Sequence, residues 1–143
     1  MSRENVEIIS RLNAVFNRGD YDALTQFLHP EVEFVDQLPL PDVPQFGRGA
    51  DEVRAVLEQW REGFTGFQAE VEEYIDLGNY VVCVTRWSFI SRDEEIKLER
   101  RGAVAHELRE GKVLWAAFGL RDKAAALEAV ERRRQDAARS SRT

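Results

Sequence analysis

Apolar residues recur at helical spacing in three segments of the first half of the chain. Ser2 can cap the first segment, and Asn17-Arg18-Gly19 closes it, because glycine readily takes the left-handed conformation that follows many helices. Asp20 can cap the second segment, which stops before Pro30 since the residue preceding a proline avoids the helical conformation. The third segment, 51–64, is the clearest amphipathic helix. Its apolar stripe consists of Val53, Val56, Leu57, Trp60 and Phe64.

Alternating apolar and polar residues predict strands in the rest of the chain. The predicted strands are 31–36, 67–77, 80–90, 96–108 and 112–121. Turn signals at Gly78-Asn79, near 92–94 and at Glu110-Gly111 join the last four strands as antiparallel hairpins, and a helix from Asp122 to about Arg134 follows them. Helices grouped ahead of an antiparallel sheet predict an α+β domain. The sheet has to curl around the helices to bury their apolar stripes, which leaves a cone open at one end.

Length and composition are those of one soluble globular domain, with 143 residues of which 43% are hydrophobic and 32% charged. We expect a single domain over 1–130 and a charged, frayed tail over 131–143. The single cysteine, Cys83, excludes an internal disulfide and fits a reducing compartment. No apolar run approaches the roughly 18 residues that span a bilayer, and the N-terminus lacks the apolar segment of a secretion signal. We therefore expect a cytoplasmic protein.

The formal net charge of −6 is unevenly spread. The segment 131–143 holds more arginines than acids, so the rest of the chain is more acidic than the net charge suggests. An acidic body repels phosphate backbones and anionic lipids, and we therefore expect neither a nucleic-acid nor a membrane partner. The arginines themselves are typical either of a solvated helix end or of an interaction tail.

The sequence lacks the motifs of several enzyme classes. It contains no glycine-rich phosphate loop followed by lysine and no Gly-x-Ser-x-Gly elbow. Its two histidines, His29 and His106, and its one cysteine do not have metal-ligand spacing. We therefore expect no cofactor and no metal ion. The parity of His106 with Val104 and Leu108 favours a packed or interface histidine over a catalytic one.

Asp36 is the candidate catalytic residue. It ends the strand 31–36 on the same face as Val32 and Phe34, because successive side chains of a strand point to opposite faces. If that face points into the cone, desolvation raises the pKa of the carboxyl group and makes Asp36 a general acid or base near neutral pH. The alternative is that Asp36 caps the turn into the proline-containing loop that follows the strand.

Four segments carry a resemblance to a known family. They are Asn17-Arg18-Gly19-Asp20, His29-Pro30-Glu31-Val32-Glu33-Phe34, Phe46-Gly47-Arg48-Gly49 and Glu110-Gly111-Lys112-Val113. With the order of elements, they resemble the SnoaL-like group of the nuclear transport factor 2-like superfamily over about residues 3 to 130. The group includes ketosteroid isomerases, polyketide cyclases, dehydratases, epoxide hydrolases and members of unknown activity. The resemblance implies a cone-shaped α+β barrel that binds a small hydrophobic molecule, but no single reaction.

The resemblance also implies a role for Asp36. Ketosteroid isomerases use an aspartate shortly after the first strand as general base, and Asp36 matches it. Their two oxyanion donors match Leu12 and Ala103, so both donors are missing and steroid isomerisation is disfavoured. Cyclase-type proton transfer on a carbonyl compound tolerates that loss better, because the substrate's own conjugation spreads the charge.

The resemblance further implies a pocket wall and a dimer interface. Strand and helix positions pointing into the cone give the predicted wall: Phe16, Val32, Phe34, Trp60, Phe64, Ala103, Ala105, Ala116, Phe118 and Leu120. The aromatic members can equally belong to the core. Family members commonly dimerise through the outer face of the sheet, where Trp87, Trp115 and Ala117 are expected. Two hypotheses follow, an isomerase- or cyclase-type enzyme that uses Asp36 and a non-catalytic binding or accessory protein.

Overall fold

The computed structural model describes residues 2–36, 46–91 and 96–141. Its elements are α1 (Ser2–Arg18), α2 (Tyr21–Thr25), β1 (Leu28–Asp36), β2 (Phe46–Arg48), α3 (Ala50–Gly63), β3 (Phe64–Asp76), β4 (Tyr80–Ser91), β5 (Lys97–Arg109), β6 (Lys112–Leu120) and α4 (Lys123–Ser141). The predicted order is confirmed, with β2 added, a strand too short for its periodicity to be recognised. The proline-containing loop and the turn predicted near 92–94 lie outside the described residues. Over the described ranges, no helix is both long and apolar enough to cross a bilayer.

The junction of α1 and α2 forms as its residues predict. Gly19 takes φ +73°, and its N–H donates to the Phe16 carbonyl at 2.9 Å. The N–H of Asp20 donates to the Val15 carbonyl at 3.3 Å, which completes a Schellman motif. The Asp20 carboxylate then accepts from the N–H of Ala23 at 3.1 Å and so caps α2.

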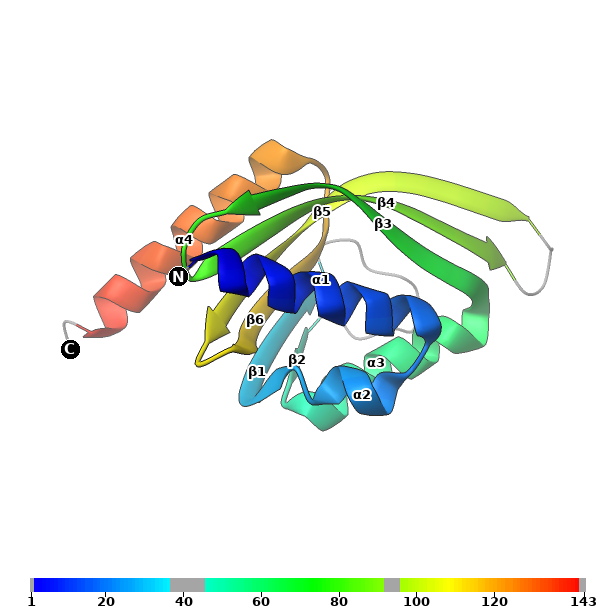
Figure 1. Ribbon diagram of the computed structural model, residues 1–143, viewed down its shortest axis with the longest axis horizontal. Coiled ribbons are helices and arrows are strands. Elements are labelled where there is room, and N and C mark those ends of the chain that lie inside the picture. Colours follow the sequence, from blue (N-terminus) through cyan, green and yellow to red (C-terminus); the bar gives the residue numbers. More distant parts are fainter. Residues whose placement is uncertain (1, 37–45, 92–95, 142–143) are drawn as a thin grey trace.

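The strands form one sheet in the order β2-β1-β6-β5-β4-β3, in which β1 runs parallel to β6 and the other neighbours are antiparallel. The sheet curls strongly, and α1 lies across its concave side with α2 and α3 beside it (Figure 1). The apolar stripes of these helices pack with the concave face into the larger core. The predicted cone-shaped α+β fold is confirmed.

The outer face of the sheet is covered by α4, on the side opposite α1 (Figure 1). Ala126 and Val130 of α4 belong to a second apolar cluster with Trp115 and Ala117 of β6, and all four side chains are buried. Trp87, the third residue expected at a dimer interface, lies on the concave side instead. Trp115 and Ala117 are buried under the chain's own α4, and the partly buried Trp87 faces the helices, so the prediction that these three residues form an interface on the outer face is wrong.

The C-terminal helix is longer and better anchored than predicted. It continues past Arg134 to Ser141, where a frayed tail was expected. The guanidinium Nε of Arg133 donates to the Glu107 carboxylate at 2.8 Å, and its Nη1 lies 3.5 Å from the Glu33 carboxylate. Arg134 donates to a backbone carbonyl of the β3–β4 turn and lies over a tyrosine ring. These arginines therefore hold α4 against the sheet.

Candidate functional site

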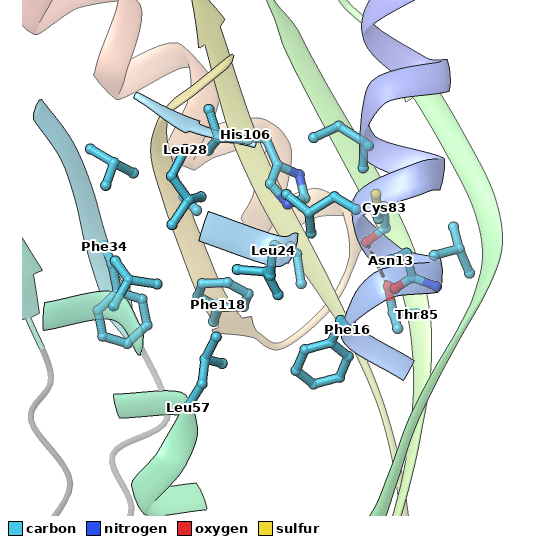
Figure 2. A pocket seen from close by; sticks show the side chains of 18 of the residues that line it. Asn13, Phe16, Leu24, Leu28, Phe34, Leu57, Cys83, Thr85, His106 and Phe118 are labelled. Atoms are coloured by element: carbon cyan, nitrogen blue, oxygen red, sulfur yellow. Dashed lines mark hydrogen bonds between the residues drawn. The ribbon is translucent and has the colours of Figure 1, made fainter. Parts of the chain in front are cut away.

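A mostly apolar cavity of about 60 Å³ lies between the helices and the concave face of the sheet. Its wall is formed by residues of β1, β4, β5 and β6, one residue of β3, and residues of α1, α2 and α3 (Figure 2). Pockets for drug-sized ligands usually measure about 300–1,000 Å³, whereas a water molecule needs roughly 15 Å³ by a comparable measure. This cavity therefore has room for a molecule of only a few non-hydrogen atoms.

Half of the predicted pocket residues line this cavity. Those on its wall are Phe16, Val32, Phe34, Ala116 and Phe118. Trp60 is buried behind the wall, with its ring edge-on to Phe118 at a centroid distance of 6.0 Å. Phe64 packs edge-on against Phe89 at 4.9 Å, near the far ends of β3 and β4. Trp60 therefore belongs to the core around the cavity, whereas the half-buried Phe64 lies in neither of the two apolar clusters.

The alanines of β5 face the opposite side of the sheet. Ala103 and Ala105 belong to the outer cluster under α4, so their prediction as pocket residues is wrong. Their neighbours Val104 and His106 occupy the cavity wall instead. Since side chains alternate along a strand, an error of one residue in the assumed register exchanged the two faces. The wide apolar pocket expected from the alanines is therefore absent from the described structure.

Leu120 is turned to the outer face by a β-bulge. In the pairing of β5 with β6, Ala105 lies opposite Ala117 but Ala103 lies opposite Leu120, so β6 contains one extra residue there. Gly119 takes φ +71°, a conformation that glycine adopts without strain. The bulge reverses the alternation after Phe118, and Leu120 joins the outer cluster. Its prediction as a pocket residue is therefore wrong as well.

Asp36 is buried at the end of β1, with 7% of its surface exposed. It continues the face formed by Val32 and Phe34, and in the parallel pairing of β1 with β6 it lies beside Phe118. Phe34 and Phe118 line the cavity, whereas Asp36 is not part of the wall. Asp36 therefore lies one step beyond the cavity, at the end where β1 stops. The turn that it was alternatively expected to cap lies outside the described residues.

Two polar side chains on the wall are directed to backbone groups. The Asn13 amide Nδ2 donates to the Ala69 carbonyl at 2.9 Å, which ties α1 to β3. The Thr85 hydroxyl donates to the Cys83 carbonyl at 3.4 Å, within β4. Burial raises the pKa of the Cys83 thiol to about 12, so this thiol is neutral at physiological pH. These residues give the wall a largely apolar character despite their polar atoms.

His106 is the other polar residue of the wall, and only 5% of it is exposed. Its Nδ1 lies 3.3 Å from the carbonyl oxygen of Val81, the residue opposite it on β4. Burial lowers the pKa of His106 to about 4, because the charged imidazolium loses its hydration; the hydrogen bond to Val81 opposes this only in part. The packed histidine predicted from its parity is thus found on the cavity side.

Groups of three or more metal-ligating side chains (His, Cys, Asp or Glu) do not occur within the described ranges. The cavity wall itself contains one histidine and one cysteine of this kind, His106 and Cys83. The chemistry that the described wall can offer is therefore apolar contact and hydrogen bonding.

Comparisons with known proteins identify the fold. The model of the SnoaL-like domain matches residues 9–116, and a comparison with curated proteins gives no match. TerC, crystallised with polyporic acid, has 19% identity and a TM-score of 0.71, over 80% of this chain and 88% of TerC. An NTF2-like protein from Burkholderia thailandensis E264 has 25% identity and a TM-score of 0.71, over 79% and 87%.

A third solved structure is a protein with a ketosteroid isomerase-like fold from Catenulispora acidiphila DSM 44928, in complex with trimethylamine. It has 11% identity and a TM-score of 0.70, over 78% of this chain and 82% of that protein. At these identities the likeness shows the shared architecture of helices on a curled sheet.

Proposed function

Because the chain belongs to the SnoaL-like domain family, we propose that it binds a small, mainly apolar carbonyl compound and moves a proton on it with Asp36. The observation that carries this proposal is the position of Asp36, which is buried and continues the cavity face of β1 one step beyond Phe34. An apolar body held in the cavity would leave its reacting carbon near that carboxyl group. The cavity volume of about 60 Å³ favours a small substrate over a polycyclic one.

The proposed reaction is a proton transfer through an enolate. The Asp36 carboxylate takes a proton from the carbon next to the substrate carbonyl, and the bond electrons move into a carbon–carbon double bond while the carbonyl oxygen gains charge. The carboxylic acid then returns the proton to a carbon of the same conjugated system, so the catalyst is restored. Burial favours the neutral form of a carboxyl group, which suits an acid that has to return its proton near neutral pH.

The substrate has to spread the enolate charge itself. The hydroxyl of Thr85 and one N–H of the Asn13 amide already donate to backbone carbonyls, so of these two side chains Asn13 alone keeps an N–H for an oxyanion. A conjugated carbonyl compound lowers this requirement, because its enolate is delocalised. The solved structures in complex with trimethylamine and of TerC crystallised with polyporic acid support a small-molecule ligand.

The shortage of unengaged hydrogen-bond donors on the cavity wall favours a second function, binding without turnover. A wall whose hydroxyl is engaged and whose amide keeps one N–H is poor in the preorganised donors on which enolising enzymes depend. In that case the cavity holds its ligand, and Asp36 contributes to stability only.

Hydrogen–deuterium exchange distinguishes the two functions. 2-Cyclopentenone, a conjugated ketone, in deuterated buffer, followed by proton NMR, reports enolisation directly. We expect the wild-type protein to accelerate the exchange and Asp36→Asn to remove about 10²–10⁴ of that acceleration. Asp51→Asn, an exposed acid on the first turn of α3, is the matched control and should behave as wild type. Binding without exchange would establish the second function, and the absence of both would refute the proposal.

The titration of Asp36 provides an independent test. The carboxyl carbon resonance that disappears in Asp36→Asn assigns the group, and its midpoint gives the pKa. A pKa of about 6 or higher supports the acid–base role, because the group then changes charge near working pH. A pKa near 4 or below would argue against it.

A further inference from the structure

The imidazole of His106 presents a hydrogen-bond acceptor to the cavity. Its Nδ1 lies 3.3 Å from the carbonyl oxygen of Val81. A carbonyl oxygen can only accept, so Nδ1 carries the proton of the neutral ring and Nε2 carries a lone pair. The tautomer of His106 is therefore fixed by the neighbouring strand.

The free nitrogen lies on the cavity side of the ring. His106 projects from β5 onto the concave face, and its Nδ1 turns to the adjacent strand β4, which leaves Nε2 at the far end of the ring. Figure 2 shows the imidazole among the apolar side chains of the wall, between the labelled Leu28 and Cys83. Over the described residues, the contact with Val81 is the hydrogen bond that His106 makes, so no described group donates to Nε2.

A water molecule is a poor partner for this nitrogen. Buried waters typically make two to four hydrogen bonds, but the Thr85 hydroxyl and one N–H of Asn13 already donate to backbone carbonyls, so these two side chains offer a water few further donors. A water beside Nε2 would therefore be weakly held, and a ligand group that displaces it loses little. An acceptor left unpaired in an apolar space is itself costly, so a donor on the ligand is favoured.

We propose that His106 Nε2 accepts a hydrogen bond from the bound ligand, which is therefore a small, mainly apolar molecule carrying one hydroxyl or N–H group. The inference rests on the proposed function, because it takes the cavity as the binding site. It adds a specificity-determining residue and a chemical class of ligand. A molecule of the same shape without a donor fills the same space but leaves Nε2 unpaired.

Pyrrole and furan test this selectivity. The two five-membered rings have nearly the same size, but only pyrrole carries an N–H donor. Titrations followed by NMR give the ratio of the furan Kd to the pyrrole Kd for each protein. This ratio should be about tenfold larger in wild type than in His106→Phe. The phenylalanine keeps a ring in the cavity and removes the acceptor. His29→Gln, which changes the other histidine of the chain, should retain the wild-type ratio.

A measurement on the wild-type protein decides the question even if His106→Phe does not fold. In protein labelled with nitrogen-15 at histidine, Nε2 of His106 should resonate as an unprotonated nitrogen and shift with pyrrole but not with furan. If both rings bind equally and this resonance does not move, the inference is refuted while cavity binding stands. If neither ring binds, the cavity is not the site, and the inference and the proposed function fail together.

Discussion

Acidification below about pH 6.5 should destabilise the fold through His106. The pKa of this residue is lowered from 6.5 to about 4 by burial, so the folded protein resists its protonation. At pH 7 the imidazole is neutral in the folded chain and mostly neutral in the unfolded chain, so little effect is expected. Between pH 6.5 and about 4 the unfolded chain binds a proton that the folded chain does not, so stability falls as the pH falls. Below pH 4 both states are protonated and the loss levels off.

The size of this effect follows from the pKa difference. One pKa unit corresponds to about 1.4 kcal/mol, so the full loss is about 3 kcal/mol and about 2 kcal/mol has been lost by pH 5. This is a large share of the roughly 5–15 kcal/mol that separates folded from unfolded domains. The other titratable group on the cavity wall, Cys83, has a pKa of about 12 and stays neutral throughout this range.

Urea unfolding at pH 7 and pH 5 measures the loss. Other groups also titrate over this interval, so the comparison that matters is between wild type and His106→Phe. Wild type should lose about 2 kcal/mol more than the variant on acidification, and His29→Gln should follow wild type. Equal losses in wild type and His106→Phe would refute the reasoning, because His106 would then not be buried as a neutral group.

Three further perturbations test the packing. Gly102→Ala should cost about 1–3 kcal/mol in urea unfolding, since its Cβ would lie 2.7 Å from a backbone oxygen of β6, whereas Gly47→Ala meets nothing closer than 3.5 Å and should be tolerated. Arg133→Gln should cost about 1 kcal/mol, less at high salt, and the exposed Arg132→Gln almost nothing. Cys83 should react with a thiol reagent only after unfolding, because it is buried and its pKa is about 12.

The local features of the fold could be predicted because they depend on neighbouring residues. Gly19 and Asp20 end one helix and begin the next through hydrogen bonds within six residues of the chain. Gly78 and Asn79 form the predicted hairpin turn, closed by a hydrogen bond from Leu77 to Tyr80. Glycine conformation and side-chain capping act over such short distances, and the sequence shows them directly.

The assignment of side chains to the two faces of the sheet could not be predicted in the same way. Alternation gives two sets of residues for each strand but does not say which set faces the helices. Bulges then exchange the sets within a strand. The register shift between Val71 and Glu73 puts Ile75 and Leu77 in the outer cluster, although alternation groups them with Val71. A glycine in a strand does not by itself identify the bulge that exchanges the two faces, since Gly102 lies in regular pairing with β4 whereas Gly119 lies in a bulge.

The full length of α4 and its packing against the sheet were not predicted, because the prediction for this segment relied on its composition. A segment rich in arginine is typical of a solvated or frayed end. In the folded chain, however, Arg133 lies between carboxylates of β1 and β5 and over the ring of Trp115. These partners are far from it in sequence, so only the folded sheet brings them together.

The candidate site was predictable only in part. Asp36 and Phe34 lie on one strand, so the sequence places them on the same face. His106 reaches the cavity only because the folded sheet brings β5 beside the other strands.

The two proposed roles are binding by His106 and proton transfer by Asp36. They can be tested separately because the two residues lie at different positions along β6 and on opposite sides of it. His106 lies opposite Ala116 on β6, and Asp36 lies beside Phe118, two residues further along the same strand and on its other side. A displacement of two residues and two strands corresponds to about 12 Å between Cα atoms. Side chains that converge from a concave face would cover part of this distance, and a small ligand would span the remainder.

A substrate that contacts both residues therefore carries its donor group at one end and its reacting carbon at the other. For a small conjugated hydroxyketone, His106→Phe should raise KM for deuterium exchange about tenfold with kcat little changed, because it removes binding that is equal in the ground and transition states. Asp36→Asn should lower kcat by about 10²–10⁴ while KM is retained. If His106→Phe instead lowered kcat as strongly as Asp36→Asn, the histidine would be part of the proton transfer, and the separation of the two roles would be wrong.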